Sequence, residues 1–457
     1  MRDEAYSTAS VPADGGRAGS GWAAPRATGR LAATVALPGS KSLTNRELVL
    51  SALADDVSTL RAPLRSRDTD LMIAALQSLG TSIEAGGGSS EEAGDDLIVT
   101  PAALAGGGEV DCGLAGTVMR FLPPIAALAD GPVRFDGDAR ARARPMATTI
   151  TSLRALGARV EDDGAGTLPF TVDGGGSVAG GRVVIDASES SQFVSGLLLA
   201  AARFEQGLDL EHRGTRLPSL PHIAMTLACL AARGVRVDTD DLTEPAARWT
   251  VRPGRIRGRT VAIEPDLSNA APFLAAALIA GGAVTVPGWP RATTQVGDRL
   301  REWLPAFGAA VHLHHDGLTV DGGDGVLGGG SLQAVDLDLS TGGELAPTLI
   351  GLAAFGDGVS RFTGIGHLRG HETDRLAALA AELTAVGCEV QELADGLVVH
   401  PALLHTPERP WRAFGDHRMA TTGALIGLAV DGLVVDDIST TAKTLPAFPA
   451  LWRDLIA

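Results

Sequence analysis

The sequence has little cysteine, it lacks any apolar segment long enough for a membrane span, and its first 29 residues lack the apolar core of a secretion signal. Its three cysteines are far apart and form no metal-ligand pattern, which predicts a reduced, cytoplasmic protein without disulfides: Cys112, Cys229 and Cys388. Residues 1–29 have no signal-peptide core and read as a disordered tail. The longest apolar run, 270–286, is cut by Gly281 and Gly282 to about eleven helical residues. That is too short for a bilayer and predicts a helix buried on all sides.

Basic residues are also scarce, with 38 Lys and Arg against 54 Asp and Glu and a net charge of −16. This balance excludes general nucleic-acid binding and makes any local group of cations a candidate for a selective anion site. One such group is in residues 37–48, LPGSKSLTNREL, where Lys41 and Arg46 fall in the first turns of a predicted helix. Each cation there costs roughly 0.3–1 kcal/mol against the helix dipole. Taken alone, the stretch is better explained as a solvated surface turn, so an anion site needs support from the rest of the chain.

Two patterns recur about every 75 residues. In the first, Leu-x-x-x-Gly precedes a β-branched strand. Glycine suits the left-handed residue just past a helix, so each copy predicts a helix end. These glycines are Gly80, Gly157, Gly234, Gly308 and Gly387. In the second pattern, a strand and a polar turn precede an Ala/Leu-rich helix, and the turns are marked by Lys41, Gly116, Ser191, Asn269, Glu344 and Arg418.

Together the patterns predict six units of roughly βαβαββ type. The helices of the second pattern are apolar on nearly every side, so other structure must surround them. The sixth unit stops at its last helix, and we expect the N-terminal stretch 30–37, RLAATVAL, to supply the strand that it lacks. If the buried helices run parallel within a lobe, their N-termini converge and form an anion-binding cleft.

The short motifs are ambiguous alone. SESSQF at 188–193 fits a helix N-cap, although three serines and a glutamine exceed what a cap needs and suggest phosphate contacts. ARARARPM at 139–146 fits a solvated basic strand. HETDRL at 371–376 lacks the second His of a zinc helix, GDGVLG at 323–328 precedes no helix, and no P-loop occurs. The sequence therefore predicts neither a metal site nor a nucleotide loop.

Seven motifs, taken in order, resemble the 3-phosphoshikimate 1-carboxyvinyltransferase (enolpyruvylshikimate-phosphate synthase) family: LPGSKSLTNR, LAGTVMRF, GDARARARPM, SSQF, GHETDRL, GDHRMA and TTAKTLP. The resemblance covers about residues 30–457. It implies an α/β fold, a two-lobed inside-out α/β barrel of six βαβαββ repeats, three per lobe around parallel buried helices. The expected division is a disordered tail at 1–24, a lobe at 41–264, and a lobe at 25–40 plus 265–457 that the N-terminal strand closes.

The same resemblance implies transfer of the enolpyruvyl (carboxyvinyl) group of phosphoenolpyruvate to the 5-hydroxyl of shikimate 3-phosphate. Phosphate is released through a tetrahedral intermediate. This is a step of the shikimate pathway, which leads through chorismate to the aromatic amino acids. The family uses no metal and no organic cofactor. We therefore expect a cytoplasmic monomer whose partners are these two small substrates, not nucleic acid or membrane.

The resemblance also assigns residues. Shikimate 3-phosphate is expected to contact Lys41, Ser42, Arg46, Ser190, Ser191, Gln192, Ser219, Glu344, His367 and His371. Phosphoenolpyruvate is expected to contact Lys41, Gly116, Arg120, Arg140, Gln192, Arg375, Arg418 and Lys443. The expected catalytic residues are Lys41, Glu344, Glu372 and Lys443. Glu344 is the candidate base toward the hydroxyl, while Glu372 and Lys443 are candidates for proton transfer at the methylene carbon, because a Glu–Lys contact moves pKa values.

Several positions differ from the commonest family pattern. They are Leu114 where Asn is usual, Phe121 for Pro, His222 for Tyr, Glu344 for Asp, His367 for Asn and His371 for Lys. Both His367 and His371 still donate hydrogen bonds, with a charge that depends on pH, and we expect His371 to titrate near pH 6.5 or somewhat above. The differences bear on affinity and pH optimum, not on the class of reaction.

Two alternatives stay open at this point. The first is the enolpyruvyl transferase of cell-wall synthesis, which acts on UDP-N-acetylglucosamine and shares the fold. Its family usually carries a reactive cysteine in the loop that corresponds to GDARARARPM, and this loop has none. The second is a non-catalytic anion-binding repeat protein, or a nucleic-acid-processing relative. The negative net charge and the Glu, Lys and Arg residues of the turns disfavour both.

Overall fold

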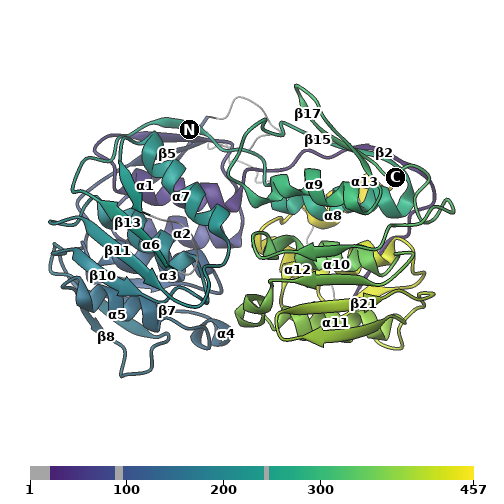
Figure 1. Cartoon of the computed structure of the whole chain (residues 1–457). Coiled ribbons are helices and arrows are strands. Elements are labelled where there is room, and N and C mark those ends of the chain that lie inside the picture. The colour runs from purple at the N-terminus through teal and green to yellow at the C-terminus, as the bar shows by residue number, and fades with distance from the viewer. Residues whose placement is uncertain (1–20, 88–95, 241–245) are drawn as a thin grey trace, which may run out of the picture.

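The molecule consists of two lobes of similar architecture (Figure 1). The structure, a computed structural model, describes residues 21–87, 96–240 and 246–457. Each lobe has its own hydrophobic core. One core is drawn from residues 48–256, and the other from residues 24–35 and 267–455. The predicted two-lobed α/β fold is confirmed.

Three units form the first lobe. The first contains α1 (Lys41–Ala52), β3 (Ser58–Arg61), α2 (Arg67–Ser78), β4 (Ser82–Gly86) and β5 (Asp96–Thr100). The second contains β6 (Glu109–Asp111), α3 (Gly116–Ala126), β7 (Val133–Asp136), α4 (Ala139–Arg142), α5 (Ala147–Ala155), β8 (Arg159–Glu161) and β9 (Phe170–Asp173). The third contains β10 (Gly181–Ile185), α6 (Gln192–Ala201), β11 (Leu208–Arg213), α7 (Leu220–Ala232), β12 (Val237–Asp240) and β13 (Ala246–Val251), and β14 (Thr260–Ala262) follows it.

Three further units form the second lobe. The fourth contains α8 (Leu267–Ala280), β15 (Gly282–Pro287), η1 (Val296–Arg299), α9 (Leu300–Ala306), β16 (Ala310–Leu313) and β17 (Gly317–Asp321). The fifth contains β18 (Asp336–Asp338), η2 (Gly343–Leu345), α10 (Ala346–Ala353), β19 (Ser360–Thr363), η3 (Gly366–Gly370), α11 (Arg375–Ala385), β20 (Glu389–Leu393) and β21 (Gly396–His400). The sixth contains α12 (His417–Gly427), β22 (Val434–Val435), η4 (Ile438–Lys443) and α13 (Phe448–Leu455).

Units one to five each contribute to a four-stranded sheet of one topology. The order β10-β11-β13-β12 is typical: β10 lies parallel to β11, and β13 lies antiparallel to both β11 and β12. Leu208 of β11 pairs with Gly181 on one side and with Val251 on the other. In each lobe, one of these sheets is completed by a strand from outside its own unit. The strand β14 completes the first unit beside β3, and β2 (Leu31–Thr34) completes the fourth beside β15.

The N-terminal stretch expected in the sixth unit belongs to the fourth instead. The reason is that β14, which directly precedes the fourth unit, pairs with the first unit and leaves the edge of β15 open for β2. The sixth unit receives a shorter strand, β1 (Trp22–Ala23), which pairs antiparallel with β22. The expected tail at 1–24 is therefore wrong for residues 21–24. The remainder of that prediction, 1–20, lies outside the described residues.

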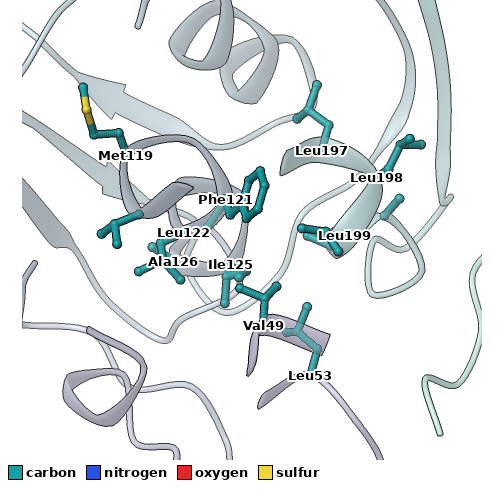
Figure 2. Close-up of a cluster of buried hydrophobic side chains, with 14 of the residues drawn as sticks. Val49, Leu53, Met119, Phe121, Leu122, Ile125, Ala126, Leu197, Leu198 and Leu199 are labelled. Carbon is teal, nitrogen blue, oxygen red and sulfur yellow. The ribbon is translucent and has the colours of Figure 1, made fainter. Parts of the chain in front are cut away.

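The predicted helix ends are confirmed, since the glycine after each of α2, α5, α7, α9 and α11 has positive φ: Gly80, Gly157, Gly234, Gly308 and Gly387. The predicted burial of the central helices holds as well. Every residue of α3, α8 and α12 is buried. Figure 2 shows part of the first core, in which Val49 of α1 lies near Ile125 of α3. Leu199 of α6 lies to the right of these two residues in the same view. Each such aliphatic side chain contributes about 1.5–3 kcal/mol when fully buried.

Candidate active site

A cavity of about 380 Å³ lies between the lobes, where the N-termini of the central helices converge. Its lining includes the first or second residue of five of these helices and a residue two positions before the sixth: Lys41 of α1, Gly116 of α3, Gln192 of α6, Ser268 of α8, Arg418 of α12, and Glu344 ahead of α10. The helices α1, α3 and α6 have no side-chain hydrogen bond at their N-caps. Their free backbone N–H groups favour an anion at this place.

Positive charge is concentrated around the cavity. Its cationic lining comes from both lobes: Lys41, Arg46, Arg120, Arg144, Arg216, Arg375, Arg418 and Lys443. Its carboxylates are Asp68, Glu189, Asp266, Glu344 and Glu372. The chain contains only two lysines, and both are here. Within a protein of net charge −16, such a cleft selects anionic ligands.

Three polar side chains meet at Gly116 because it has no side chain of its own. A Cβ atom at this position would lie 3.0 Å from Gln192 Oε1, 3.1 Å from Arg144 Nη2 and 3.2 Å from Arg120 Nη1. The guanidinium of Arg120 packs over the ring of Phe193, and its Nη1 donates to Gln192 Oε1. The Nε groups of Arg120 and Arg144 are buried without a hydrogen-bond partner among the described residues. An anion between them would supply the missing acceptors.

The expected contact of Arg140 with phosphoenolpyruvate stays a prediction. Arg140 does not line the cavity; it is exposed on α4, and its Nη1 donates to the carbonyl oxygen of Phe414 in the other lobe. Arg144 from the same motif lines the cavity instead, and its Nη1 donates to the carbonyl oxygen of Leu114 at 3.4 Å. Because α4 ends at Arg142, the chain turns before Arg144 and directs it inward.

Arg46 is buried with its guanidinium fixed from several sides. Nε donates to Thr226 Oγ1 at 2.8 Å, Nη1 to the carbonyl oxygen of Ser42 at 2.9 Å, and Nη2 to that of His222 at 3.0 Å. The guanidinium also packs over the ring of Phe121, 5.2 Å from its centroid. Burial lowers the pKa of Arg46 to about 10, so it stays cationic at neutral pH.

In the second lobe, acidic and basic side chains form a buried network. Arg375 donates from Nε to Asp416 Oδ2 at 2.7 Å and from Nη2 to Glu372 Oε2 at 2.9 Å. Lys443 Nζ bonds the other oxygen of Glu372. Burial opposes ionisation of Glu372, yet Lys443 and Arg375 hold its pKa well below the usual range. Burial lowers the pKa of Lys443, against the attraction of Glu372.

Glu344 is held by groups from both lobes. Its Oε1 accepts from the hydroxyl of Ser268, and its Oε2 lies 3.2 Å from His222 Nε2. Burial alone would raise the pKa of Glu344, but His222, Arg418 and the Ser268 hydroxyl lower it well below the usual range. The carboxylate is therefore ionised throughout the physiological range.

Lys41 lies where the chain crosses between the lobes. Its backbone N–H donates to Asp266 Oδ2 at 3.0 Å, and its Nζ lies 3.4 Å from Asp68 Oδ2. Asp266 also caps α8, and burial raises its pKa. The two crossings are joined by a bridge between Gly39 and Pro265. The position of Lys41 is thus tied to the connection between the lobes.

The predicted serines all line the cavity: Ser42, Ser190, Ser191 and Ser219. So do His367 and His371, whose rings lie 5.8 Å apart. The expectation that His371 titrates near pH 6.5 or above is wrong, because burial and the adjacent Arg375 lower its pKa well below that value. Burial and Arg216 likewise lower the pKa of His367 to about 4. Both rings are neutral at pH 7 and act as hydrogen-bonding groups.

Comparison with known proteins decides the family. The model of the EPSP synthase (3-phosphoshikimate 1-carboxyvinyltransferase) family matches residues 25–452. The chain belongs to the EPSP synthase family. It is 53% identical over 440 residues to a 3-phosphoshikimate 1-carboxyvinyltransferase of Kocuria rhizophila, covering 95% of this chain and 96% of that protein.

Solved structures agree at the level of the fold. An EPSP synthase of Acinetobacter baumannii has a TM-score of 0.76 at 23% identity and covers 95% of this chain and 97% of its own. The enolpyruvyl transferase NikO of Streptomyces tendae has a TM-score of 0.70 at 16% identity, covering 94% and 96%. Both are similar to this chain in their whole two-lobed architecture.

In this member of the EPSP synthase family, the cavity includes residues that the motifs do not single out. These are Asp68, Arg144, Glu189, Arg216, His222, Asp266, Ser268 and Gln295. Three of them had a sequence indication: Arg144 stands in the same basic run as Arg140, Glu189 stands in SESSQF, and His222 replaces the usual Tyr of the family pattern. Among the described residues, no group of His, Cys, Asp and Glu could hold a metal, and no helix has the length and hydropathy of a membrane span.

Proposed function

We propose that this protein transfers the enolpyruvyl group of phosphoenolpyruvate to the 5-hydroxyl of shikimate 3-phosphate and releases phosphate. The observation that carries the proposal is one cavity where central-helix N-termini and cations of both lobes meet. Two substrates that each carry a phosphate and a carboxylate match that charge. Membership of the EPSP synthase family supports the same reaction.

The first lobe provides most of the proposed contacts to shikimate 3-phosphate. They are Lys41, Ser42, Arg46, Ser190, Ser191, Gln192 and Ser219, joined by Glu344, His367 and His371 of the second lobe. Phosphoenolpyruvate is proposed to bind where Gly116 leaves room for an anion. Its contacts are Lys41, Gly116, Arg120, Arg144, Gln192, Arg375, Arg418 and Lys443. Arginine suits these roles because its planar donors engage phosphate and carboxylate bidentately.

The chemistry needs a proton removed from the 5-hydroxyl while its oxygen bonds to C2 of phosphoenolpyruvate, and a proton delivered to C3. Glu344 is ionised and directed toward the cavity by Ser268, which suits the side of the hydroxyl. Lys443 and Glu372 are in contact, and this pair is proposed to deliver the proton to C3. The tetrahedral intermediate then loses phosphate and a methyl proton, which returns to the same pair. Lys41 is proposed to stabilise charge between the two substrates.

This reaction places the protein in the shikimate pathway of aromatic amino acid biosynthesis. We propose a cytoplasmic monomer with the lobes divided at 41–264 and at 25–40 plus 265–457. The three cysteines, all free and buried, support a reducing compartment. Size-exclusion chromatography with light scattering tests the monomer.

Release of inorganic phosphate tests the function. The purified protein is incubated with phosphoenolpyruvate and either shikimate 3-phosphate or UDP-N-acetylglucosamine. We expect stoichiometric phosphate release and an enolpyruvyl ether only with shikimate 3-phosphate. Release only with the UDP-sugar would assign the cell-wall reaction instead, and no release with either would indicate a non-catalytic anion-binding protein.

A further inference from the structure

His222 and Glu344 form a contact between the lobes inside the cavity. His222 lies in the first turn of α7, and Glu344 lies in η2 of the second lobe. Their atoms Nε2 and Oε2 are 3.2 Å apart, and both residues line the cavity. Their side chains are 19% and 25% exposed, so each keeps an accessible part that a substrate can reach.

Neighbouring groups fix the orientation of this pair. Ser268 holds the second oxygen of Glu344. The backbone carbonyl of His222 accepts hydrogen bonds from Arg46 Nη2 and Thr226 Oγ1, both at 3.0 Å. An imidazole whose Nε2 carries the proton toward the carboxylate has a lone pair on Nδ1. That nitrogen accepts no hydrogen bond from the residues that the structure describes.

Glu344 by itself is a weak proton acceptor, because its ionised carboxylate is hydrogen-bonded to Ser268 and His222 and stabilised by the charge of Arg418. An imidazole exchanges its proton near neutral pH and is more basic than such a carboxylate. A carboxylate behind an imidazole selects the tautomer and stabilises the imidazolium that forms. The arrangement of these two side chains is that of such a pair.

We propose that His222 is a catalytic residue of the transfer reaction, accepting the substrate hydroxyl proton on Nδ1 while Glu344 orients its ring through Nε2. The inference rests on the proposed function. The O–H bond breaks and its proton moves to Nδ1, as an oxygen lone pair forms the bond to C2 of phosphoenolpyruvate. The electron pair of the C2–C3 double bond takes a proton from the Lys443 side. When the intermediate breaks down, C3 returns its proton to the Lys443 side and the electron pair of that C–H bond re-forms the C2–C3 double bond. Phosphate leaves with the electron pair of its C–O bond and takes the proton of the imidazolium, which restores neutral His222.

Several charged groups surround Glu344. Arg46, Arg375 and Arg418 bear on Glu344 as cations, and Asp266 bears on it as an anion. A change of pH profile is therefore assigned to His222 only through its own variants, with these neighbours left in place.

The test compares His222→Gln and Glu344→Asp with the unaltered enzyme between pH 5 and 9, measuring kcat and both KM values. We expect His222→Gln to lower kcat by about 10²-fold or more, to change each KM by no more than about threefold, and to remove the acidic limb of the kcat profile. Glu344→Asp, which withdraws the carboxylate from Nε2 by one methylene, should lower kcat and keep a histidine-dependent limb. His312→Gln, on an exposed strand position outside the cavity, is the matched control and should match the unaltered enzyme.

Retention of kcat within about threefold in His222→Gln, with the acidic limb still present, would overturn the proposal and leave Glu344 as the base. A raised KM for shikimate 3-phosphate with an unchanged pH profile would also overturn it, because His222 would then only bind substrate. Direct titration of shikimate 3-phosphate into His222→Gln checks that the cavity is folded. Turnover by the unaltered enzyme reports on the proposed function separately from each of these results.

Discussion

At the scale of single residues, the choice between lysine and arginine separates proton transfer from anion binding. Of the 38 basic residues only two are lysines, Lys41 and Lys443, and both line the cavity. Arginine keeps its proton in proteins, whereas a buried lysine shifts its pKa readily. A chain that uses arginine almost everywhere else therefore keeps its two lysines for the cavity, and at one of them, Lys443, a proton is proposed to move.

Replacement of Lys443 by Met should reduce kcat by about 10²-fold or more without unfolding the protein. The fold should persist because Glu372 keeps its bond to Arg375. Lys443→Arg keeps the charge but cannot donate a proton, so its kcat should fall while its KM for phosphoenolpyruvate changes less. Steady-state phosphate release and circular dichroism check both variants, and near-normal turnover in either would remove Lys443 from proton transfer.

The pH dependence of the unaltered enzyme should also report on Lys443. Burial lowers its pKa, so the protonated, proton-donating form is lost at a lower pH than for a free lysine, whose pKa is about 10.4. We therefore expect kcat to be level at neutral pH and to fall as pH rises through that lowered pKa. A kcat that stays constant up to pH 10.4 would contradict the role as a proton donor.

Replacement of Arg144 and of Arg140, the two arginines at issue in the basic run, should affect phosphoenolpyruvate binding to different extents. Loss of a partner to a buried anion costs about 2 kcal/mol or more, so Arg144→Ala should lower kcat/KM for phosphoenolpyruvate by roughly 30-fold or more. Arg140→Ala removes an exposed side chain outside the cavity and should change it by no more than about threefold. Steady-state kinetics with varied phosphoenolpyruvate decide the assignment, and the reverse order of effects would return the site to Arg140.

At the scale of helices and strands, the start of α3 shows how backbone geometry shapes the cavity. Gly116→Ala places a methyl group about where Gln192, Arg120 and Arg144 converge, with the nearest atoms at 3.0–3.2 Å. These are the ends of flexible side chains, so we expect the helix to keep its stability and the KM for phosphoenolpyruvate to rise by roughly tenfold. Gly29→Ala, at a position with no neighbouring atom within 4 Å, is the control for kinetics and melting temperature. Unchanged KM values in Gly116→Ala would mean that the substrate binds elsewhere.

The first lobe depends on an ion pair between α1 and the end of α7. Arg233 is fully buried and donates to Glu47 Oε2 at 2.7 Å, to the hydroxyls of Ser51 and Ser58, and to the carbonyl oxygen of Arg257. Arg233→Met leaves Glu47 buried without its partner, which should cost about 3–5 kcal/mol of unfolding free energy.

Urea unfolding followed by tryptophan fluorescence measures this loss. Arg236→Met, whose side chain is 86% exposed on the same lobe, is the matched control and should unfold like the unaltered protein. Equal midpoints for the two variants would show that the buried pair contributes no net stability.

At the scale of the whole molecule, both lobes depend on strands exchanged between distant parts of the chain. In the second lobe, Trp22 and Ala23 pair with Val435 and Val434, and Ala24 N–H donates to the carbonyl oxygen of Leu433 at 2.9 Å. Deletion of residues 1–24 should therefore lower the melting temperature relative to deletion of residues 1–20, which leaves this strand intact. Differential scanning calorimetry compares the two proteins, and identical melting temperatures would show that β1 adds nothing to the second lobe.

Local patterns in the sequence were sufficient for the repeat, the helix ends and the family. Glycine just past a helix predicts a left-handed residue, and this holds at positions 80, 157, 234, 308 and 387. Unbroken apolar runs predict the central helices. Both kinds of prediction succeed because each depends only on residues that are neighbours in the sequence. Most of the helix-start residues that the sequence marks line the cavity, among them Lys41, Gly116 and Arg418, whereas Asn269 does not.

Only the tertiary structure decided which strand completes which sheet, which arginine faces the cavity, and how the histidines titrate. The strand β14 pairs with β3 of the first lobe, and β2 pairs with β15 of the second lobe. Each partner lies more than 190 residues away in sequence, so no local pattern could predict the pairing. Arg140 and Arg144 are chemically identical and differ only in where α4 ends. The lowered pKa of His371 and the contact of His222 with Glu344 depend on burial and on a neighbour from another element, because the energy of a charge is set by its three-dimensional surroundings and not by its position in the chain.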